Sequence, residues 1–259
     1  MTTQKFIWPE GEELVYLRPP KEEYHGRLPN FYPPEWFPEL NLLKENWQAI
    51  RDEILAYERE RGNIKGMGSY SPAQVSGTDW STINLMSYMV LFHKNRERFP
   101  VLTALTDRIP NITTVTISVL SPHTEIKPHY GDTNGVIRAH VGLIVPEPYP
   151  AIALQVGDEA QGWADGEVMA FTIVQRHLAW NRSDHKRYVL IIDFVPEVLA
   201  DRQTEICRKT LGSQTYIFLY KRIGVLRHLP EFLAGFSCAF FSFLWWFLLP
   251  VQRRLKLFL

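Results

Sequence analysis

The sequence predicts a mainly β protein with flanking helices, whose β part forms an antiparallel sandwich or barrel. From residue 113 onward, short β-branched segments follow one another at a spacing of roughly 10–15 residues. Turn-forming residues separate these segments, and no helical pattern lies between them. A later stretch, 232–249, is 18 residues long and carries no charge. We therefore expect the β domain to be followed by a separate apolar helix.

Composition excludes several classes of protein. The chain has 259 residues, and its 28 Lys and Arg balance its 28 Asp and Glu, so the net charge is zero. A general nucleic-acid binder needs a surplus of positive charge, so we expect no nucleic-acid partner. The 46% hydrophobic and 22% charged residues exclude a wholly disordered chain. Cys207 and Cys238, the only cysteines, are too few for a disulfide scaffold or a cysteine-rich zinc site.

The chain is expected to divide into three parts. Residues 1–69 form an N-terminal arm and helical lead-in, 70–197 form the β domain, and 198–259 form a helical tail that contains the apolar segment. The first residues are polar and then acidic, without the apolar core of a secretory signal. We therefore expect the catalytic part to meet the cytosol.

The lead-in combines an irregular arm with helices. Prolines and aromatic residues crowd residues 6–40, which forbids a long helix and predicts an arm wrapped on the domain surface. A ligand for a proline-recognising module is the alternative. Apolar residues at three-to-four spacing predict an amphipathic helix over 39–61, and a second helix is expected over 101–109.

The strands of the β domain are marked by β-branched residues, several of them in near alternation with other residues. Clusters of Gly, Asp, Asn and Pro bound each segment. Strands are predicted over residues 113–120, 136–145, 152–156, 168–173 and 188–194.

Two histidines of the β domain are candidate metal ligands. His129 follows the end of a predicted strand, and His177 comes 177 − 129 = 48 residues later. Two imidazoles from neighbouring strands can bind one face of a ferrous ion. The third ligand on that face is usually a carboxylate, which lies two residues after the first histidine. That position is Gly131 here. Asp132 is one residue further and would point to the other side of an extended strand.

Basic residues accompany these histidines. Arg187 lies ten residues after His177, on the next predicted strand, where its guanidinium fork can pair bidentately with a dicarboxylate. Arg138 and His140 share one face of their strand because side chains alternate with a period of two. We expect both to flank the same pocket.

Four ordered motifs run through this domain: P-H-x-G-x-T-N from Pro128, R-x-H-x-G-L from Arg138, a W-x-x-G-E turn from Trp163, and H-x-x-W from His177. Together they resemble the aspartyl/asparaginyl β-hydroxylase family, over about residues 70 to 197. The resemblance implies a double-stranded β-helix, a relative of the jelly roll. It also implies hydroxylation of an unactivated carbon with Fe(II), 2-oxoglutarate and O₂.

The resemblance assigns expected roles to seven residues. By motif, His129 and His177 look like the catalytic iron ligands, and Arg187 looks like the partner of the distal carboxylate of 2-oxoglutarate. The remaining matches to co-substrate or pocket positions are Trp80, Ser118, Arg138 and His140.

Several alternatives stay open. Members of the family can have glycine at the position of the third, carboxylate ligand. In some other iron enzymes a small residue at this position admits halide, so a halogenase is one alternative. A non-catalytic metal- or 2-oxoglutarate-binding module on the same barrel is another. A sugar-binding cupin would need further metal ligands at strand spacing, which the sequence does not show. Aspartyl or asparaginyl side chains, free amino acids and lipid acyl chains all remain possible substrates.

The apolar segment 232–249 would extend for roughly 27 Å as a helix, near the hydrocarbon thickness of a bilayer. Trp245 and Trp246 suit a membrane interface, and positive charges flank both ends of the segment. We expect membrane association at the cytoplasmic face, either as a short span or as a hairpin lying in one leaflet. A buried or dimerising helix of a cytoplasmic protein is the alternative. A membrane tail favours a lipid or membrane-bound acyl substrate over a soluble amino acid.

Overall fold

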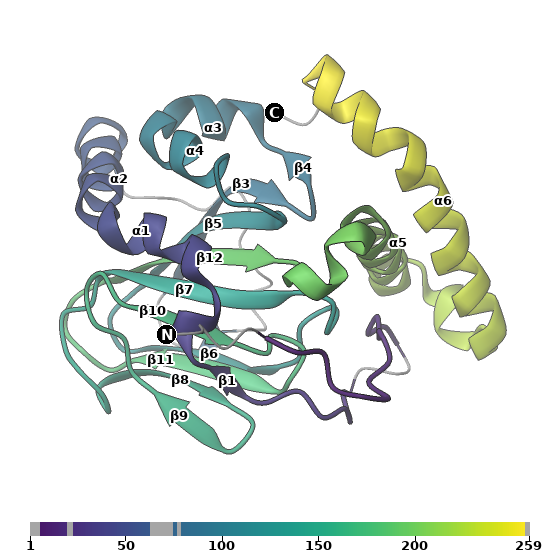
Figure 1. The fold of residues 1–259 in the computed structure, drawn as a ribbon. Helices are drawn as coiled ribbons and strands as arrows, with labels where there is room; N and C mark the ends of the chain where they lie inside the picture. Colours follow the sequence, from purple (N-terminus) through teal and green to yellow (C-terminus); the bar gives the residue numbers. More distant parts are fainter. Residues whose placement is uncertain (1–5, 20–22, 63–74, 77–78, 257–259) are drawn as a thin grey trace.

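The computed structural model describes residues 6–19, 23–62, 75–76 and 79–256. Two antiparallel sheets face each other, and helices cover the outer face of the larger one (Figure 1). The larger sheet has the order β1-β10-β7-β12-β5-β3-β4. Its strands are β1 (Phe31–Tyr32), β3 (Trp80–Ser87), β4 (Val90–Leu91), β5 (Ile112–Leu120), β7 (Ile137–Ile144), β10 (Val168–Phe171) and β12 (Arg187–Phe194).

The smaller sheet has the order β2-β6-β11-β8-β9. Its strands are β2 (Val75–Ser76), β6 (Thr124–His129), β8 (Ile152–Val156), β9 (Glu159–Gln161) and β11 (His177–Asn181). From β5 onward the chain alternates between the two sheets, and only the β8–β9 hairpin stays in one of them. This winding is a double-stranded β-helix, so the predicted fold class is confirmed.

The larger sheet is buried on both faces. Every residue of β12 is buried, and its side chains alternate between two clusters. Leu190, Ile192 and Phe194 pack beneath the helices, whereas Val189 and Ile191 pack between the two sheets. Every second side chain of the strand therefore points into the space between the sheets.

The lead-in helices are shorter than the sequence predicts. The helix expected over 39–61 is divided into α1 (Asn41–Glu45) and α2 (Trp47–Arg61), because the backbone of Asn46 leaves the helical region and its side chain bonds to Leu42 instead. A short 3-10 turn, Pro38–Leu40, precedes α1. The other helices before β5 are η1 (Pro34–Trp36), α3 (His93–Arg98) and α4 (Pro100–Thr106).

The N-terminal arm is held by the barrel. The bond donated by the Val15 amide to Asn134 Oδ1 is 2.8 Å long, and that donated by Thr133 Oγ1 to the Val15 carbonyl is 2.7 Å long. Further along, Tyr32 lies in β1 at the edge of the larger sheet and packs against Phe6 with ring centroids 5.4 Å apart. The arm is thus part of the folded domain. The expected domain boundary near residue 70 lies outside the described residues.

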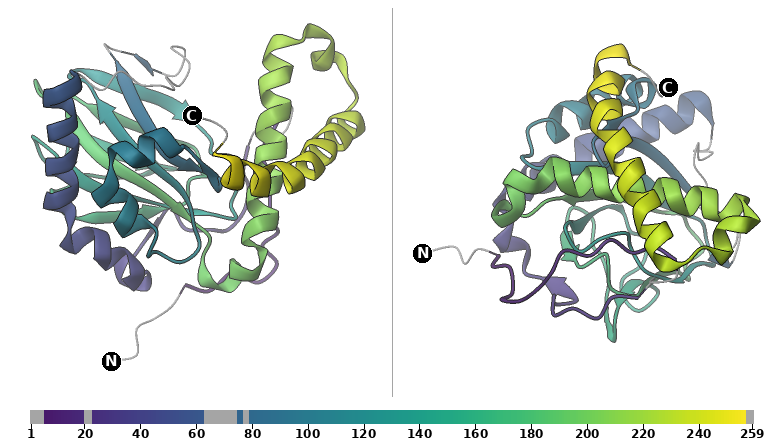
Figure 2. Two further views of the ribbon diagram at one scale, coloured as in Figure 1. Left: turned by 90° about the horizontal axis from the view of Figure 1, so that it is seen from above. Right: turned by 90° about the vertical axis from the view of Figure 1, so that its right-hand side faces the viewer.

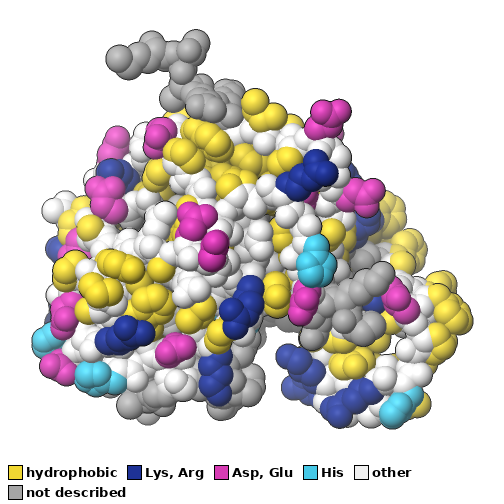
Figure 3. Space-filling model, turned by 90° about the horizontal axis from the view of Figure 1, so that it is seen from below, with side chains coloured by type: hydrophobic (Ala, Val, Ile, Leu, Met, Phe, Trp, Pro, Cys, Tyr) yellow, Lys and Arg dark blue, Asp and Glu magenta, His cyan; other side chains and the backbone are white. Residues whose placement is uncertain are grey.

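The tail forms a helical hairpin that projects from the barrel (Figure 2). It consists of η4 (Glu197–Arg202), α5 (Gln203–Arg222), η5 (Gly224–His228) and α6 (Glu231–Leu255). The two long helices approach closely at small residues: a Cβ on Gly212 would lie 2.2 Å from Ser242 Oγ and 2.7 Å from the Cys238 carbonyl oxygen. Seen from below, the hairpin is a separate lobe with hydrophobic side chains along its outer edge (Figure 3).

Candidate active site

The two candidate iron ligands face each other across neighbouring strands of the smaller sheet. His129 ends β6, His177 begins β11, and the register pairs them directly. Their ring centroids lie 4.1 Å apart. The fold therefore brings together two imidazoles that lie 48 residues apart in the sequence, since 177 − 129 = 48.

The backbone fixes the tautomer of both rings. His129 Nδ1 lies 2.8 Å from the carbonyl oxygen of Lys127, and His177 Nδ1 lies 2.8 Å from that of Gln175. A carbonyl oxygen only accepts, so each Nδ1 carries the proton and each Nε2 keeps its lone pair. Burial lowers the pKa of both rings, and for His177 the neighbouring His129 lowers it further. Neutral imidazoles held in this way fit a divalent metal ion.

The third ligand position is closed to a side chain. The Gly131 amide donates to the Ile173 carbonyl oxygen, and a Cβ on this glycine would lie 2.6 Å from the same oxygen. Asp132 turns away from the histidines and accepts hydrogen bonds of 3.0 Å from Tyr88 Oη and Gln214 Nε2. Among the described residues, no group of three or more His, Cys, Asp or Glu side chains is arranged to hold a metal.

All seven residues that the sequence singled out line one pocket between the sheets. The histidine pair lies at one end, level with Arg138 on β7 and Asp193 on β12. Arg187 begins β12 and enters the pocket from the other side, where the rings of Trp163, His140 and Phe171 form a continuous row of contacts between its guanidinium and His177. The lining residues are Trp80, Ser118, Ile126, His129, Arg138, His140, Leu154, Phe171, His177, Ala179, Arg187 and Ile191.

Polar atoms at the Arg187 end are buried without partners. Arg187 is 1% exposed, and its Nε and Nη1 make no hydrogen bond. The same holds for both ring nitrogens of His140 and for Trp163 Nε1. The Trp163 ring stacks on His140 at 5.7 Å and lies 5.0 Å from Arg187 Cζ. Buried donors without partners are costly, so this end of the pocket suits an anionic ligand.

Burial also sets the charges of this cluster. It lowers the pKa of Arg187 to about 9, so the guanidinium remains a cation at neutral pH. Burial, with help from Arg138 and Arg187, holds the pKa of His140 well below its ordinary value, so this ring is neutral. The pocket thus presents one unpaired cation beside a neutral imidazole.

Arg138 has a partner that the sequence did not predict. Its Nε and Nη2 donate to the two oxygens of Asp193 at 2.6 and 2.8 Å, and the carboxylate is 1% exposed. The sequence indicates only a structural carboxylate at Asp193. The register of β7 and β12, which places the two residues opposite each other, is not readable from either segment alone.

Ser118 and Trp80 are joined at the edge of the pocket. Trp80 Nε1 donates to Ser118 Oγ over 3.0 Å. Ser118 also lies opposite Val189 on β12, two residues from Arg187. The serine hydroxyl therefore has its own hydrogen to donate toward a ligand near the arginine.

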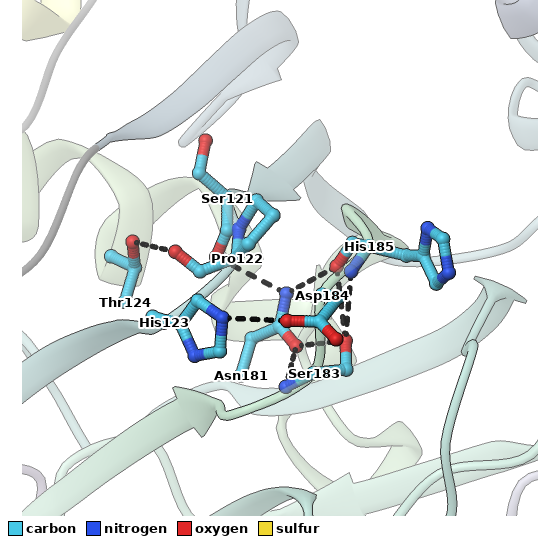
Figure 4. Close-up of polar contacts among 8 residues, drawn as sticks. All are labelled: Ser121, Pro122, His123, Thr124, Asn181, Ser183, Asp184 and His185. Atoms are coloured by element: carbon cyan, nitrogen blue, oxygen red, sulfur yellow. Dashed lines mark hydrogen bonds and ion pairs between the residues drawn. The ribbon is translucent and has the colours of Figure 1, made fainter.

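A knot of polar contacts around Asn181 lies at the end of the barrel, in the turns that follow β5 and β11 (Figure 4). Asn181 Nδ2 donates to the backbone carbonyls of Leu120, Ser121 and His185 at 3.0, 3.1 and 2.8 Å. These bonds tie the turn after β5 to the turn that leads into β12. The buried Asn181 thereby fixes the backbone immediately before Arg187. At the surface beside it, His123 Nε2 lies 2.9 Å from Asp184 Oδ1.

The family model described as aspartyl/asparaginyl beta-hydroxylase matches residues 44–196. The ornithine lipid ester-linked acyl 2-hydroxylase of Rhizobium tropici is 32% identical over 191 residues, which are 73% of this chain and 66% of that protein. The aspartyl/asparaginyl beta-hydroxylase of Homo sapiens is 26% identical over 162 residues, which are 60% of this chain and 20% of that protein.

The chain thus spans about two thirds of the bacterial relative and a fifth of the human one. Among solved structures, a Cupin 2 conserved barrel domain protein from Salinispora arenicola is 12% identical, with a TM-score of 0.31. The match covers 55% of this chain and 98% of that structure.

Proposed function

The chain belongs to the aspartyl/asparaginyl β-hydroxylase family, and from this premise we propose that it is an Fe(II)- and 2-oxoglutarate-dependent dioxygenase. Its proposed substrate is the acyl chain of a membrane lipid, in which it hydroxylates an unactivated carbon. The observation that carries the proposal is the pocket with a pair of neutral imidazoles at one end and an unpaired buried guanidinium at the other.

The histidine end would hold ferrous iron through the Nε2 atoms of His129 and His177. With these two neutral protein ligands, the ion would still have room to bind the keto-acid end of 2-oxoglutarate and O₂. Bound together, iron and 2-oxoglutarate supply the oxidising chemistry, in which O₂ is consumed, 2-oxoglutarate becomes succinate and CO₂, and a C–H bond becomes C–OH.

The opposite end would hold the distal carboxylate of 2-oxoglutarate. The Arg187 fork can donate two parallel hydrogen bonds, and the Ser118 hydroxyl lies on the neighbouring strand to donate a third. Trp80 orients that hydroxyl. His140 and Trp163 offer further donors along the wall, and each contact would satisfy a polar atom that is otherwise buried without a partner.

Arg138 has a separate role in this proposal. Because Asp193 engages two of its nitrogens, its charge is balanced and its position is fixed at the histidine end. There it can contact the co-substrate without adding a second unpaired cation. The apolar side chains around these groups, such as Phe171 and Leu154, exclude water from the reacting atoms.

The lipid substrate is supported by two features outside the pocket. α6 is long and apolar enough to cross a membrane, judged by length and composition. The relative from Rhizobium tropici, which aligns with 73% of this chain, is named for the hydroxylation of a lipid acyl group. We place the protein at the cytoplasmic face of a membrane, acting on a lipid and on no nucleic acid.

The test is turnover of the purified full chain with Fe(II), ascorbate, 2-oxoglutarate and bacterial lipids. We expect succinate to form with a lipid that gains one oxygen atom, and His177→Ala to abolish both. His185→Ala, which changes an exposed histidine outside the pocket, should leave turnover intact. A product without succinate, or undiminished succinate from His177→Ala, would refute the proposed chemistry. No decarboxylation under any condition would identify a binding module instead.

A further inference from the structure

Both halves of α6 are fastened to the rest of the protein. In its first half, Ala234, Cys238 and Ser242 are buried against α5. In its second half, Gln252 is fully buried, and its side-chain amide bonds to both the amide and the carbonyl of Leu91 in β4. α6 therefore runs back from the tip of the hairpin to the edge of the barrel.

This path is incompatible with a helix that crosses a bilayer. Inserting the hairpin tip first would carry α5 into the hydrocarbon region together with Arg208, Lys209 and Lys221. A cation at the centre of a bilayer costs roughly 2.5–3.5 kcal/mol or more. Inserting α6 alone would break the contacts of Gln252 with β4 and those of Ser242 with α5. A helix that lies along a membrane surface keeps all of these contacts.

The outward face of α6 is suited to that position. Its exposed side chains are almost all apolar and large, and they continue from the first turn to the last. They gather on the outer edge of the hairpin lobe (Figure 3). The set comprises Phe232, Leu233, Phe236, Phe240, Phe243, Leu244, Trp246, Phe247, Leu248, Val251 and Leu255. An apolar face of this size on a soluble domain marks an interaction site.

A groove lies between this helix, α5 and the N-terminal arm. We call it the arm–hairpin groove, and its walls differ in character. α6 supplies apolar and small side chains, whereas the arm and α5 supply three cations and, among the described lining residues, no carboxylate. The lining residues are Leu14, Tyr16, Arg18, Arg208, Lys209, Ser213, Gly235, Cys238, Ala239, Ser242 and Phe243.

Two of the three cations are available to a ligand. Lys209 is engaged by Glu205 at 2.6 Å. Arg208 Nε, in contrast, is buried without a hydrogen bond, as is the Tyr16 hydroxyl in the same groove. Within the part of the chain that the structure describes, Arg18 makes one hydrogen bond, of 3.4 Å to the neighbouring Pro19 carbonyl oxygen. Its Nη2 would lie 3.4 Å from a Cβ on Gly235 of α6. Positive charge thus lies beside the apolar helix.

The groove also adjoins the iron end of the active site. Arg18 lines a second depression, together with His129, Gly131 and Lys221, which opens the histidine end of the pocket to the outside. An amphiphile seated in the groove would therefore have its head group near Arg18 and its tail within reach of the active-site mouth.

We propose that the arm–hairpin groove binds the anionic head group of a phospholipid while the outward face of α6 lies flat in one leaflet. Arg18 and Arg208 pair with the head-group anion, and Ala239 and Phe243 contact its acyl chains. The role of this site in delivering substrate rests on the proposed function. Membrane binding itself needs neither iron nor turnover.

The test is flotation of the full-length protein with vesicles of phosphatidylcholine alone or with 30% phosphatidylglycerol, without iron. We expect binding that depends on phosphatidylglycerol and is weakened about tenfold to thirtyfold by Arg18→Gln with Arg208→Gln, since a cation near an anionic membrane contributes roughly 1 kcal/mol. The control removes the same charge from α2 with Arg59→Gln and Arg61→Gln, on a helix far from the hairpin (Figure 1).

A second variant tests the apolar face. Phe236→Ser with Phe247→Ser should abolish vesicle binding while the protein keeps its thermal unfolding midpoint, because both side chains are at least half exposed. The proposal would be overturned if the Arg18/Arg208 variant and the Arg59/Arg61 control lost vesicle binding equally. It would also be overturned if both the Arg18/Arg208 variant and the Phe236/Phe247 variant still bound vesicles. Vesicle binding without any succinate formation would instead refute the proposed function and leave the membrane site standing.

Discussion

Arg187 lies over the indole ring of Trp163, with its Cζ 5.0 Å from the ring centre and with Nε and Nη1 lacking any hydrogen bond. The indole supports the guanidinium from one side but leaves its fork unpaired. An aromatic face compensates a desolvated cation only in part. The pocket is therefore built around a charge that a ligand has to complete.

Arg187→Ala should raise the apparent KM for 2-oxoglutarate by about 30-fold or more, since charge-assisted hydrogen bonds each contribute roughly 1.5–3 kcal/mol. Succinate formation at varied 2-oxoglutarate measures the effect. Arg182→Ala is the matched control, because Arg182 stacks on Trp180 at 4.9 Å but is exposed. An unchanged KM in Arg187→Ala would remove Arg187 from the co-substrate site.

Gly131→Asp should not create a tighter iron site. Its Cβ would lie 2.5 Å from Ile173 Cγ1 and 2.6 Å from the Ile173 carbonyl oxygen, so the backbone must shift. We expect the free energy of unfolding to fall by about 1–3 kcal/mol, as for overpacked interiors, and Gly131→Ala to lose a similar amount. Urea unfolding and Fe(II) titration measure the two quantities. Tighter iron binding at unchanged stability would contradict this account.

Asn181→Asp keeps the shape of the side chain but removes the Nδ2 donor that joins three carbonyls. We expect a loss of about 2–4 kcal/mol in unfolding free energy, because the carbonyls lose a buried partner and face a carboxylate. The apparent KM for 2-oxoglutarate should rise more than the Kd for Fe(II), since His177 lies at the other end of β11. Asp184→Ala, at the exposed surface of the same knot, should change stability by less than about 0.5 kcal/mol. Equal effects on iron and 2-oxoglutarate would argue against a positioning role toward Arg187.

The apoprotein should lose stability as the pH falls below about 6.5, the ordinary pKa of histidine. Burial holds the pKa of His140 well below that value, so the unfolded chain binds a proton there that the folded chain does not. Such a difference lowers the free energy of unfolding by up to about 1.4 kcal/mol for each histidine and for each unit by which the pH falls. His140→Gln should flatten the decline between pH 5 and 6.5 in urea unfolding without metal. A slope identical to that of the unchanged protein would show that this ring does not contribute.

The sequence predicts the strands that are rich in β-branched residues better than the strands of mixed polarity. β5, β7 and β12 are rich in β-branched residues and are buried along their length, so their pattern is strong. β6, with the sequence TEIKPH, and β3, with WSTINLMS, mix polar and apolar residues without clear alternation. Neither forms a convincing strand alone, and each is held by its neighbours in the sheet.

The residues of the candidate site also fall into two groups, those that sequence motifs identify and those that only the fold brings together. Motifs along the chain are enough to select His129, His177 and Arg187 as one set. The partners that fix them depend on contacts between distant segments. Asp193 meets Arg138 only through the register of two strands, and Thr133 and Asn134, which look like part of a catalytic motif, anchor an arm more than 100 residues earlier. Local periodicity carries no signal for such pairs.

The two hydrogen bonds between Gln252 and Leu91 bear on how a detergent-free form of this protein can be made. Deleting α6 would leave both main-chain groups of Leu91 in the edge strand β4 without their Gln252 partner. It would also remove Leu249 and so uncover the hydrophobic cluster that contains Tyr88 and Val90. The shortened chain would lose one exposed apolar surface but gain another, and its unpaired edge strand would favour aggregation. Solubility is better sought by changing the outward phenylalanines than by truncation.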